Sequence, residues 1–210
     1  MPGARTEPSR AEGTGEPLYA LPADLRPLEA VRGSMLFLDW TWLRTHGCYD
    51  AYAGLVEAPH RDALLGAATS DWVPLAPLLA HYRALDGIKL SRTEAFDVGR
   101  LVGERLHGAL LATILRLAGG LGATPWLALG QAHKMWERTW RGGGIAVHRI
   151  HERTARAESI GNPCAISPFH RASFSGAFAI GLASLCKASR IEEIEGARTP
   201  DSFALSVEWA

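Results

Sequence analysis

Residues 203–209 alternate large apolar side chains with small or polar ones. One set of alternate positions is Phe203, Leu205, Val207 and Trp209, and the other set is Ala204, Ser206 and Glu208. Successive side chains of a strand leave opposite faces, so this period of two predicts a half-buried strand. A shorter and more polar segment, 190–195, precedes it, and the Gly, Pro and Asp in 196–201 are typical of a turn. The two segments therefore predict an antiparallel hairpin.

A second hairpin is predicted upstream, from segments 144–150 and 154–160. Ile145 and Val147 share one face of the first segment. Charged residues are frequent elsewhere in the hairpin, namely Arg149, Glu152, Arg153, Arg156 and Glu158. Such charges indicate that one side of the sheet meets water.

Between the hairpins, residues 168–187 have the pattern of a helix that packs across the sheet. Ser167 is a suitable N-cap, and Pro168 stands at the first helical position, where its missing N–H costs nothing. Large apolar residues recur at helical spacing, namely Phe174, Phe178, Leu182 and Leu185. A second set at helical spacing is small, namely Ala172, Gly176, Ala179 and Ala183. Small residues either let another backbone approach closely or leave space for another molecule.

The chain before these hairpins reads as helices. Ser91 and Glu94 form a capping box that opens a long helix over 92–118, and Gly119-Gly120 follow it as a helix stop. A further helix is predicted over 125–140, which carries Trp126, Met135, Trp136 and Trp140. Trp136 and Trp140 are four positions apart and so are predicted to share a face of this helix.

Together these elements predict an α+β fold, because helices and strands are segregated along the chain. The predicted architecture is an N-terminal helical half packed on a four-stranded antiparallel sheet, formed by two hairpins with a helix between them. Residues 1–20 are rich in Pro, Gly, Glu, Arg and Ser without periodicity, so a disordered tail is expected there. Residues 21–210 are expected to form a single domain.

Composition excludes several classes of protein. Basic and acidic residues both number 22, so no net charge favours nucleic acid as a partner. The three cysteines, Cys48, Cys164 and Cys186, are scattered, which favours a reducing compartment over a disulfide scaffold. No signal-peptide pattern follows Met1, and no apolar run reaches the roughly 20 residues that cross a bilayer. We therefore expect a cytoplasmic protein without membrane insertion.

Four stretches resemble a family of myxobacterial paralogues of unknown function. They are the glycine-spaced apolar helix 98–108, the Trp-Arg-Gly-Gly-Gly of 140–144, segment 168–178 and the closing strand 203–209. The likeness covers about residues 31–209. The family is distantly similar to vinyl-reductase-type ligand-binding domains, haem nitric-oxide sensor domains and the small subunits of vesicle-tethering complexes. The resemblance implies an α+β fold and a sensing, ligand-binding or adaptor role, and it implies no reaction.

Neither a metal nor a haem is expected. Cys164, His170 and Cys186 lie in the closing unit, but they lack the paired short spacing of a structural zinc site. The haem sensors in the resemblance carry a Tyr-x-Ser-x-Arg signature that binds the haem propionates. None of the four tyrosines here is followed by it: Tyr19, Tyr49, Tyr52 and Tyr82. No cofactor is predicted.

An enzyme is not expected either, and no catalytic residue is assigned. The sequence contains no Gly-x-Ser-x-Gly elbow, no phosphate-binding loop and no Gly-x-Gly-x-x-Gly after a strand. The glycines of 142–144 read as a connection between a helix and a strand.

Two functions remain open. The preferred hypothesis is a non-enzymatic sensor or adaptor that acts through protein association, including self-association as a homodimer, since tryptophan is enriched at interface hot spots. The alternative is a sensor for a small apolar or aromatic molecule, held between helices 125–140 and 168–187, because ligand pockets are mostly apolar and aromatic. Both hypotheses use the same candidate site residues: Met135, Trp136, Trp140, Phe174 and Phe178.

Overall fold

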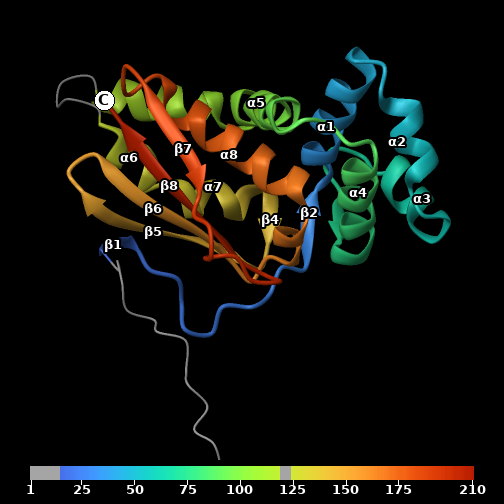
Figure 1. The fold of residues 1–210 in the computed structure, drawn as a ribbon, viewed down its shortest axis with the longest axis horizontal. Coiled ribbons are helices and arrows are strands. Elements are labelled where there is room, and N and C mark those ends of the chain that lie inside the picture. The colour runs from blue at the N-terminus through green and yellow to red at the C-terminus, as the bar shows by residue number, and fades with distance from the viewer. Residues whose placement is uncertain (1–14, 119–123) are drawn as a thin grey trace, which may run out of the picture.

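The computed structural model describes residues 15–118 and 124–210, and it contains a five-stranded antiparallel sheet (Figure 1). Its strand order is β1-β5-β6-β8-β7. The strands are β1 (Glu16–Tyr19), β5 (Gly144–His151), β6 (Thr154–Ile160), β7 (Ser189–Glu193) and β8 (Phe203–Trp209). Both predicted hairpins are present as β5–β6 and β7–β8. The α+β class with an antiparallel sheet is thereby confirmed.

The fifth strand corrects the predicted tail and the predicted strand count. Glu16–Tyr19 pairs with β5, from Glu16 opposite Arg149 to Tyr19 opposite Val147, so order begins before residue 21. The strand is four residues long and its register shifts between Pro17 and Tyr19, which leaves no alternating pattern to recognise. Proline is tolerated here because β1 is an edge strand. The remainder of the expected tail, residues 1–14, lies outside the described residues.

The register of the sheet places the alternating residues of β8 as predicted. Leu205 lies opposite Ala157 of β6, which in turn lies opposite Val147 of β5, and all three side chains are buried. On the other face, Arg156 pairs with Ser206, and both are partly exposed. One face of the sheet is therefore core, and the other is more open to water.

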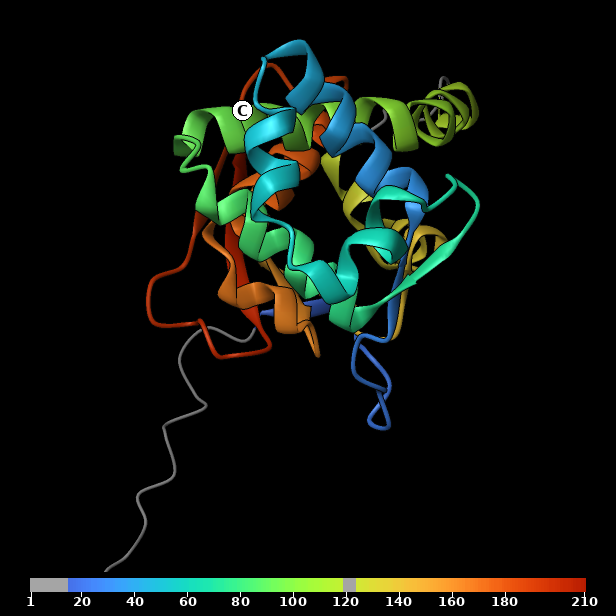
Figure 2. The ribbon, with the colours of Figure 1, turned by 90° about the vertical axis from the view of Figure 1, so that its right-hand side faces the viewer.

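Helices of the N-terminal part form a group beside the sheet (Figures 1 and 2). They are α1 (Gly33–Thr45), α2 (Tyr49–Leu55), α3 (Ala58–Leu65) and α4 (Leu75–Gly87). A second, three-stranded sheet links this group to the rest of the chain, in the order β3-β2-β4. Its strands are β2 (Ala30–Arg32), β3 (Trp72–Pro74) and β4 (Trp140–Arg141).

The helix predicted over 125–140 is two helices. α6 (Pro125–Leu129) and α7 (Ala132–Thr139) are separated at Gly130-Gln131, where a glycine weakens the helix. Trp140 begins β4 and so does not share a helix with Trp136, which corrects that prediction. The chain leaves the helix there because Trp140 pairs with Val31 of β2.

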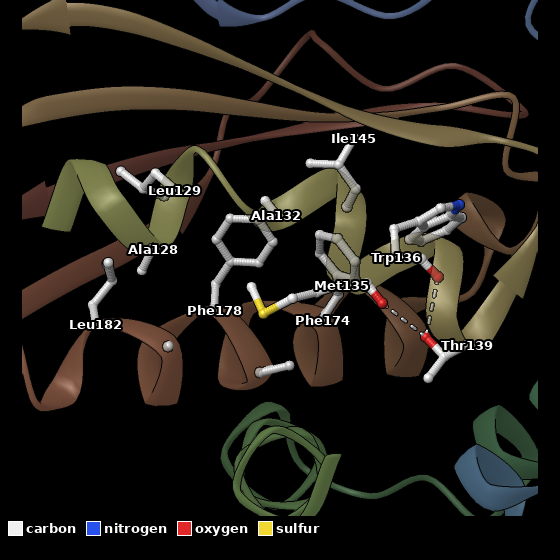
Figure 3. A pocket seen from close by; sticks show the side chains of 12 residues that line it. Ala128, Leu129, Ala132, Met135, Trp136, Thr139, Ile145, Phe174, Phe178 and Leu182 are labelled. Carbon is white, nitrogen blue, oxygen red and sulfur yellow. Dashed lines mark hydrogen bonds between the residues drawn. The ribbon is translucent and has the colours of Figure 1, made fainter. Parts of the chain in front are cut away.

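Two long helices complete the fold. α8 (Pro168–Ala183) follows a short 3-10 helix, η1 (Pro163–Ile166), and packs on β7, while α5 (Arg92–Ala118) packs along α8 on the side away from the sheet (Figure 3). α8 ends at Ala183, four residues earlier than predicted. The glycines proposed to stop α5, 119 and 120, lie outside the described residues.

Both predicted helix starts are confirmed. The Ser167 hydroxyl accepts a hydrogen bond from the His170 backbone N–H at 3.1 Å. At α5, the Glu94 N–H donates to the Ser91 hydroxyl at 3.2 Å, and the Ser91 N–H donates to the Glu94 carboxylate at 2.7 Å. These reciprocal bonds satisfy N–H groups that have no partner within the helix.

Small residues bring α5 and α8 into close contact. A Cβ atom on Gly176 of α8 would overlap the Phe96 carbonyl oxygen of α5, and one on Gly103 would come within 3.1 Å of Ala177. The small residues of 172–183 therefore serve, at Gly176, as a site of close backbone approach. No helix in the described part of the chain is both long and apolar enough to span a membrane.

Candidate functional site

An apolar cavity of about 60 Å³ lies between α6–α7 and α8, beside β5 (Figure 3). Four of the five candidate residues, Met135, Trp136, Phe174 and Phe178, line it. The remaining lining is almost entirely aliphatic: Ala128, Leu129, Ala132, Thr139, Ile145, Ala177, Gly181 and Leu182. Segments that are 40 residues apart in the sequence thus meet around one hollow, as the helix patterns predicted. That these residues bind a ligand remains a prediction.

Aromatic contacts hold the walls of this cavity in place. The rings of Phe174 and Phe178 lie one helical turn apart, with centroids 5.1 Å apart. Trp136 meets Phe174 edge to face, with a centroid distance of 6.2 Å and an interplanar angle of 73°. Its indole N–H donates to the Gly142 carbonyl at 3.0 Å, so its polar atom is satisfied away from the cavity.

The cavity offers a ligand little hydrogen bonding. Thr139 is its only hydroxyl-bearing residue, and that hydroxyl lies 3.3 Å from the Trp136 carbonyl and 3.5 Å from the Met135 carbonyl of its own helix. No charged side chain among the described residues lines the cavity. A charged or strongly polar ligand would lose its hydration here without compensation, so the lining favours an uncharged, apolar one.

Trp140, the fifth candidate, does not line the cavity. Its ring stacks on Trp136 with a centroid distance of 4.6 Å and an interplanar angle of 9°. Trp136 is 4% exposed and Trp140 is 5% exposed. An interface anchor must be accessible in the free chain, so this burial favours the pocket interpretation of these two residues over the interface interpretation.

His170 lies in the middle of the aromatic core behind the cavity. Its ring is 4.8 Å from that of Tyr82 and 5.9 Å from those of Phe174 and Phe203. Its Nε2 accepts from the Asn162 side chain at 2.9 Å. Burial, with a smaller effect of Arg171, lowers the pKa of His170 to about 3, so the imidazole is neutral near pH 7.

A buried polar chain, which the sequence patterns did not reveal, links α1, α2 and α4. The Trp40 indole N–H donates to the Tyr52 hydroxyl at 3.0 Å, and that hydroxyl lies 2.8 Å from His81 Nδ1. His81 Nε2 lies 3.0 Å from the Asp39 carboxylate. In the tautomer with its proton on Nε2, His81 donates to the Asp39 carboxylate and accepts from the Tyr52 hydroxyl at Nδ1.

Every member of this chain is at least nine-tenths buried, and burial raises the pKa values of Asp39 and Tyr52. None of these residues lines any of the cavities described in this section. The chain therefore ties three helices together, away from these three cavities. The residues are 29 and 42 positions apart, and no local motif could have identified them.

Two further hollows differ from the first in polarity. One, of about 270 Å³, lies at the start of α8 and carries four charged side chains, namely Asp86, Arg92, Arg171 and Glu193. The other, of about 550 Å³, is an open groove beside α7. Charged residues also line much of that groove: Asp24, Arg26, Glu29, Glu137 and Arg141.

Metal ligands do not gather in the described residues, where no group of three or more His, Cys, Asp and Glu side chains is placed to hold an ion. The cysteines are free thiols in the structure. Cys164 is buried, and that burial raises its pKa, so the thiol stays protonated and unreactive near pH 7.

Comparison with known proteins relates the fold to H-NOX domains. No protein-family model and no curated protein matches the sequence. Among solved structures, the Fe(II) unliganded H-NOX protein from K. algicida is similar, with a TM-score of 0.61, 10% identity, and coverage of 85% of this chain and 96% of that one. A mutant of that protein gives a TM-score of 0.62 at the same identity and coverage. The F78L variant of Tt H-NOX gives a TM-score of 0.51, with 10% identity and coverage of 85% of this chain and 94% of that one. The likeness therefore establishes the haem nitric-oxide sensor fold, one of the three distant similarities expected, and gives no support to the myxobacterial family.

The three cavities formed by the described residues do not fit a haem in their size and lining. Haem iron needs a side chain such as histidine with a free ring nitrogen beside a large apolar space. Both ring nitrogens of His81 are engaged, and His170 and His133 each have one ring nitrogen in a hydrogen bond. His148 has a buried Nδ1 without a hydrogen-bond partner among the described residues, but neither His148 nor any of the other three lines the apolar cavity. The apolar cavity, at about 60 Å³, is far below the roughly 300 Å³ at which small-molecule sites begin. The larger hollows are lined by charges.

Proposed function

We propose that this chain is a sensor domain that binds a small apolar molecule in the cavity between α6–α7 and α8. The observation that carries the proposal is the set of apolar and aromatic side chains that line the cavity, including Met135, Trp136, Phe174 and Phe178. The similarity of the fold to H-NOX domains, which are sensors, is consistent with it. No enzymatic step is part of the proposal.

Volume limits the ligand. A dry cavity of about 150 Å³ lined by Leu, Ile and Phe takes up benzene or xenon. This cavity holds about 60 Å³, so it suits a ligand of a few atoms unless a wall moves. Met135 provides such a wall, because its unbranched side chain has several rotatable bonds and adapts to irregular space.

The cavity lies between elements that contact much of the domain, so ligand binding there can shift other elements. Its ligand would touch α7 and α8 at once. α7 leads directly into β4 and β5, and α8 packs against α5 and β7. A ligand that separates α7 from α8 would therefore shift elements on both sides of the domain.

Protein association draws less support as the main function. Its strongest candidates were tryptophans, and Trp136 and Trp140 are buried within the chain. The large exposed apolar side chains of the described residues, Phe37, Leu55, Leu127 and Ile166, come from four different elements. Single exposed apolar residues of this kind are normal on monomeric proteins.

Two glycines allow a matched test. Gly181 of α8 lines the cavity, and a Cβ atom there would meet open space. Gly54 of α2 is also helical with open space around it, but it lies outside the cavity. Gly181→Leu should fill the hollow, whereas Gly54→Leu adds the same side chain elsewhere.

Xenon is the first probe and benzene the second, each followed by the NMR shift of the Met135 methyl group. We expect saturable shifts in the wild type and in Gly54→Leu, and loss of these shifts in Gly181→Leu. Shifts that persist unchanged in Gly181→Leu would place binding elsewhere and overturn the proposal. Absence of saturation with either probe in the wild type would do the same.

A further inference from the structure

The cavity of about 270 Å³ at the start of α8 is separate from the apolar one. α8 contributes Pro168, Phe169, Arg171, Ala172 and Ser175 to it, and contributes Phe174, Ala177, Phe178, Gly181 and Leu182 to the first cavity. These two sets lie on different faces of the helix, each with its own spacing of three and four residues. The rest of the second cavity comes from α4, α5, β7 and the connection between α4 and α5.

Arg171 is the central charge of this cavity. It is 8% exposed, and removing a guanidinium from water is costly unless most of its donors find partners. Nε donates to Glu193 at 3.0 Å, and Nη1 donates to the Ala165 and Ile166 carbonyls at 2.7 and 3.1 Å. Nη2 makes no hydrogen bond with any atom that the structure describes, so one end of a cavity-lining guanidinium remains available.

Asp86 also lines this cavity, and one of its carboxylate oxygens has no hydrogen-bond donor among the described residues. Its Oδ1 accepts from the Ser167 hydroxyl at 3.0 Å and from the Phe169 N–H at 2.9 Å, which fixes the carboxylate at the start of α8. Its Oδ2 and the Oε1 of Glu193 have no hydrogen-bond donor among the residues described. Burial raises the pKa of Asp86 despite its two donors.

The charges decide the class of ligand. Two carboxylates, Asp86 and Glu193, and two guanidiniums, Arg92 and Arg171, line the cavity, so its formal charge is balanced. A simple anion would meet both carboxylates, and a simple cation would meet both guanidiniums. A molecule with one group of each sign can pair with both sets at once.

Apolar residues complete the lining: Leu85, Leu90, Ala95, Pro168, Phe169 and Ala172. They offer contact to an aliphatic side chain. The volume of about 270 Å³ is close to the lower end of small-molecule sites, about 300 Å³. We propose that this cavity binds a small zwitterion of the α-amino-acid class, with its carboxylate on Arg171 and Arg92 and its ammonium group near Asp86 and Glu193. The inference is independent of the function proposed for the apolar cavity.

The test compares three molecules of similar shape by calorimetry on the full chain: L-leucine, 3-methylbutanoate and 3-methylbutylamine. We expect saturable binding of L-leucine, and at least about tenfold weaker binding of both single-charge analogues, because each loses one charge-assisted contact. Glycine and L-alanine test how much the apolar wall contributes. If no amino acid binds by about 10 mM, or if an analogue binds as well as leucine, the proposal fails.

Asp86→Asn separates charge from structure. The amide oxygen can still accept from Ser167 and Phe169, while the negative charge is lost. We expect weaker binding of leucine by about tenfold and, at the same time, tighter binding of 3-methylbutanoate. A loss of affinity shared equally by both molecules would indicate a folding defect and would count against the proposal.

Arg92→Gln tests the carboxylate end without touching the buried Arg171. Arg92 is exposed at the first position of α5, and Arg100, which is exposed further along the same helix outside the cavity, gives the matched control. We expect Arg92→Gln to lower the affinity for L-leucine severalfold and Arg100→Gln to leave that affinity unchanged. Equal behaviour of the two variants would contradict the assigned position of the ligand carboxylate.

Discussion

Gly99 of α5 lies directly against Ser173 of α8, so closely that a Cβ atom on Gly99 would overlap the Ser173 carbonyl oxygen. The two helices meet through their backbones at this point. The same helix α8 also carries Gly181, where an added Cβ would meet nothing within 4 Å. The two glycines therefore differ in role: Gly99 allows the two backbones to touch, and Gly181 borders a cavity.

Alanine substitutions should separate these roles. Gly99→Ala should lower the free energy of unfolding by about 1–3 kcal/mol, because the helices must move apart. Gly181→Ala should raise it by about 0.5–1 kcal/mol, because glycine is a poor helix former and the new methyl group has space. Urea unfolding followed by circular dichroism measures both. Equal effects of the same sign would mean that the close approach of α5 and α8 is absent in solution.

Trp136→Ala tests whether the residue is core or surface. Trp136 is 4% exposed, so its removal should lower the free energy of unfolding by about 3–5 kcal/mol. Phe37→Ala is the control, since Phe37 is 47% exposed and should change stability by less than about 0.5 kcal/mol. If the two variants were equally stable, the stacking of Trp136 on Trp140 could not be part of a packed core.

Stability should fall in mild acid because of His170. In the folded chain burial lowers its pKa from the ordinary 6.5 to about 3, so only the unfolded chain binds a proton between these values. The contribution of His170 to the free energy of unfolding is therefore complete above pH 6.5. Below pH 6.5 it is lost by about 1.4 kcal/mol for each unit that the pH falls.

Urea titrations between pH 7 and pH 5 measure this slope. His170→Gln cannot bind the proton and can still accept from Asn162, so its stability should depend less steeply on pH than that of the wild type. Parallel curves for the two proteins would mean that His170 is solvated in the folded state.

Tyr52→Phe should reveal the cost of breaking the buried polar chain. Loss of the hydroxyl leaves the Trp40 N–H and His81 Nδ1 without partners in a site closed to water. We expect the free energy of unfolding to fall by about 1–3 kcal/mol. Tyr49→Phe, at a neighbouring tyrosine that is partly exposed, should have little effect. A neutral result for Tyr52→Phe would indicate that water enters the chain.

Local patterns predicted the elements well where one signal dominated. The alternation of Phe203 to Trp209 fixed both the strand and its buried face, and the Ser167-Pro168 pair fixed the start of α8. Elsewhere the sequence patterns were too short or too weak to identify an element or its boundary. β1 has only four residues, and the break at Gly130 depends on one weak helix position.

The candidate site was predicted in part for a similar reason. Helical spacing correctly grouped Phe174 with Phe178, and tryptophan content drew attention to Trp136. Trp140 was misplaced because a strand partner, Val31, lies more than 100 positions away in sequence. The charged cavity was not anticipated, since Asp86, Arg171 and Glu193 come together only through the tertiary fold.

The shared use of α8 by both hollows has a thermodynamic consequence. The helix α8 presents Arg171 to the charged cavity and Phe178 to the apolar one. A ligand that displaces α8 on binding to one cavity also changes the shape of the other cavity. By thermodynamic linkage, each ligand then changes the dissociation constant of the other ligand by the same factor.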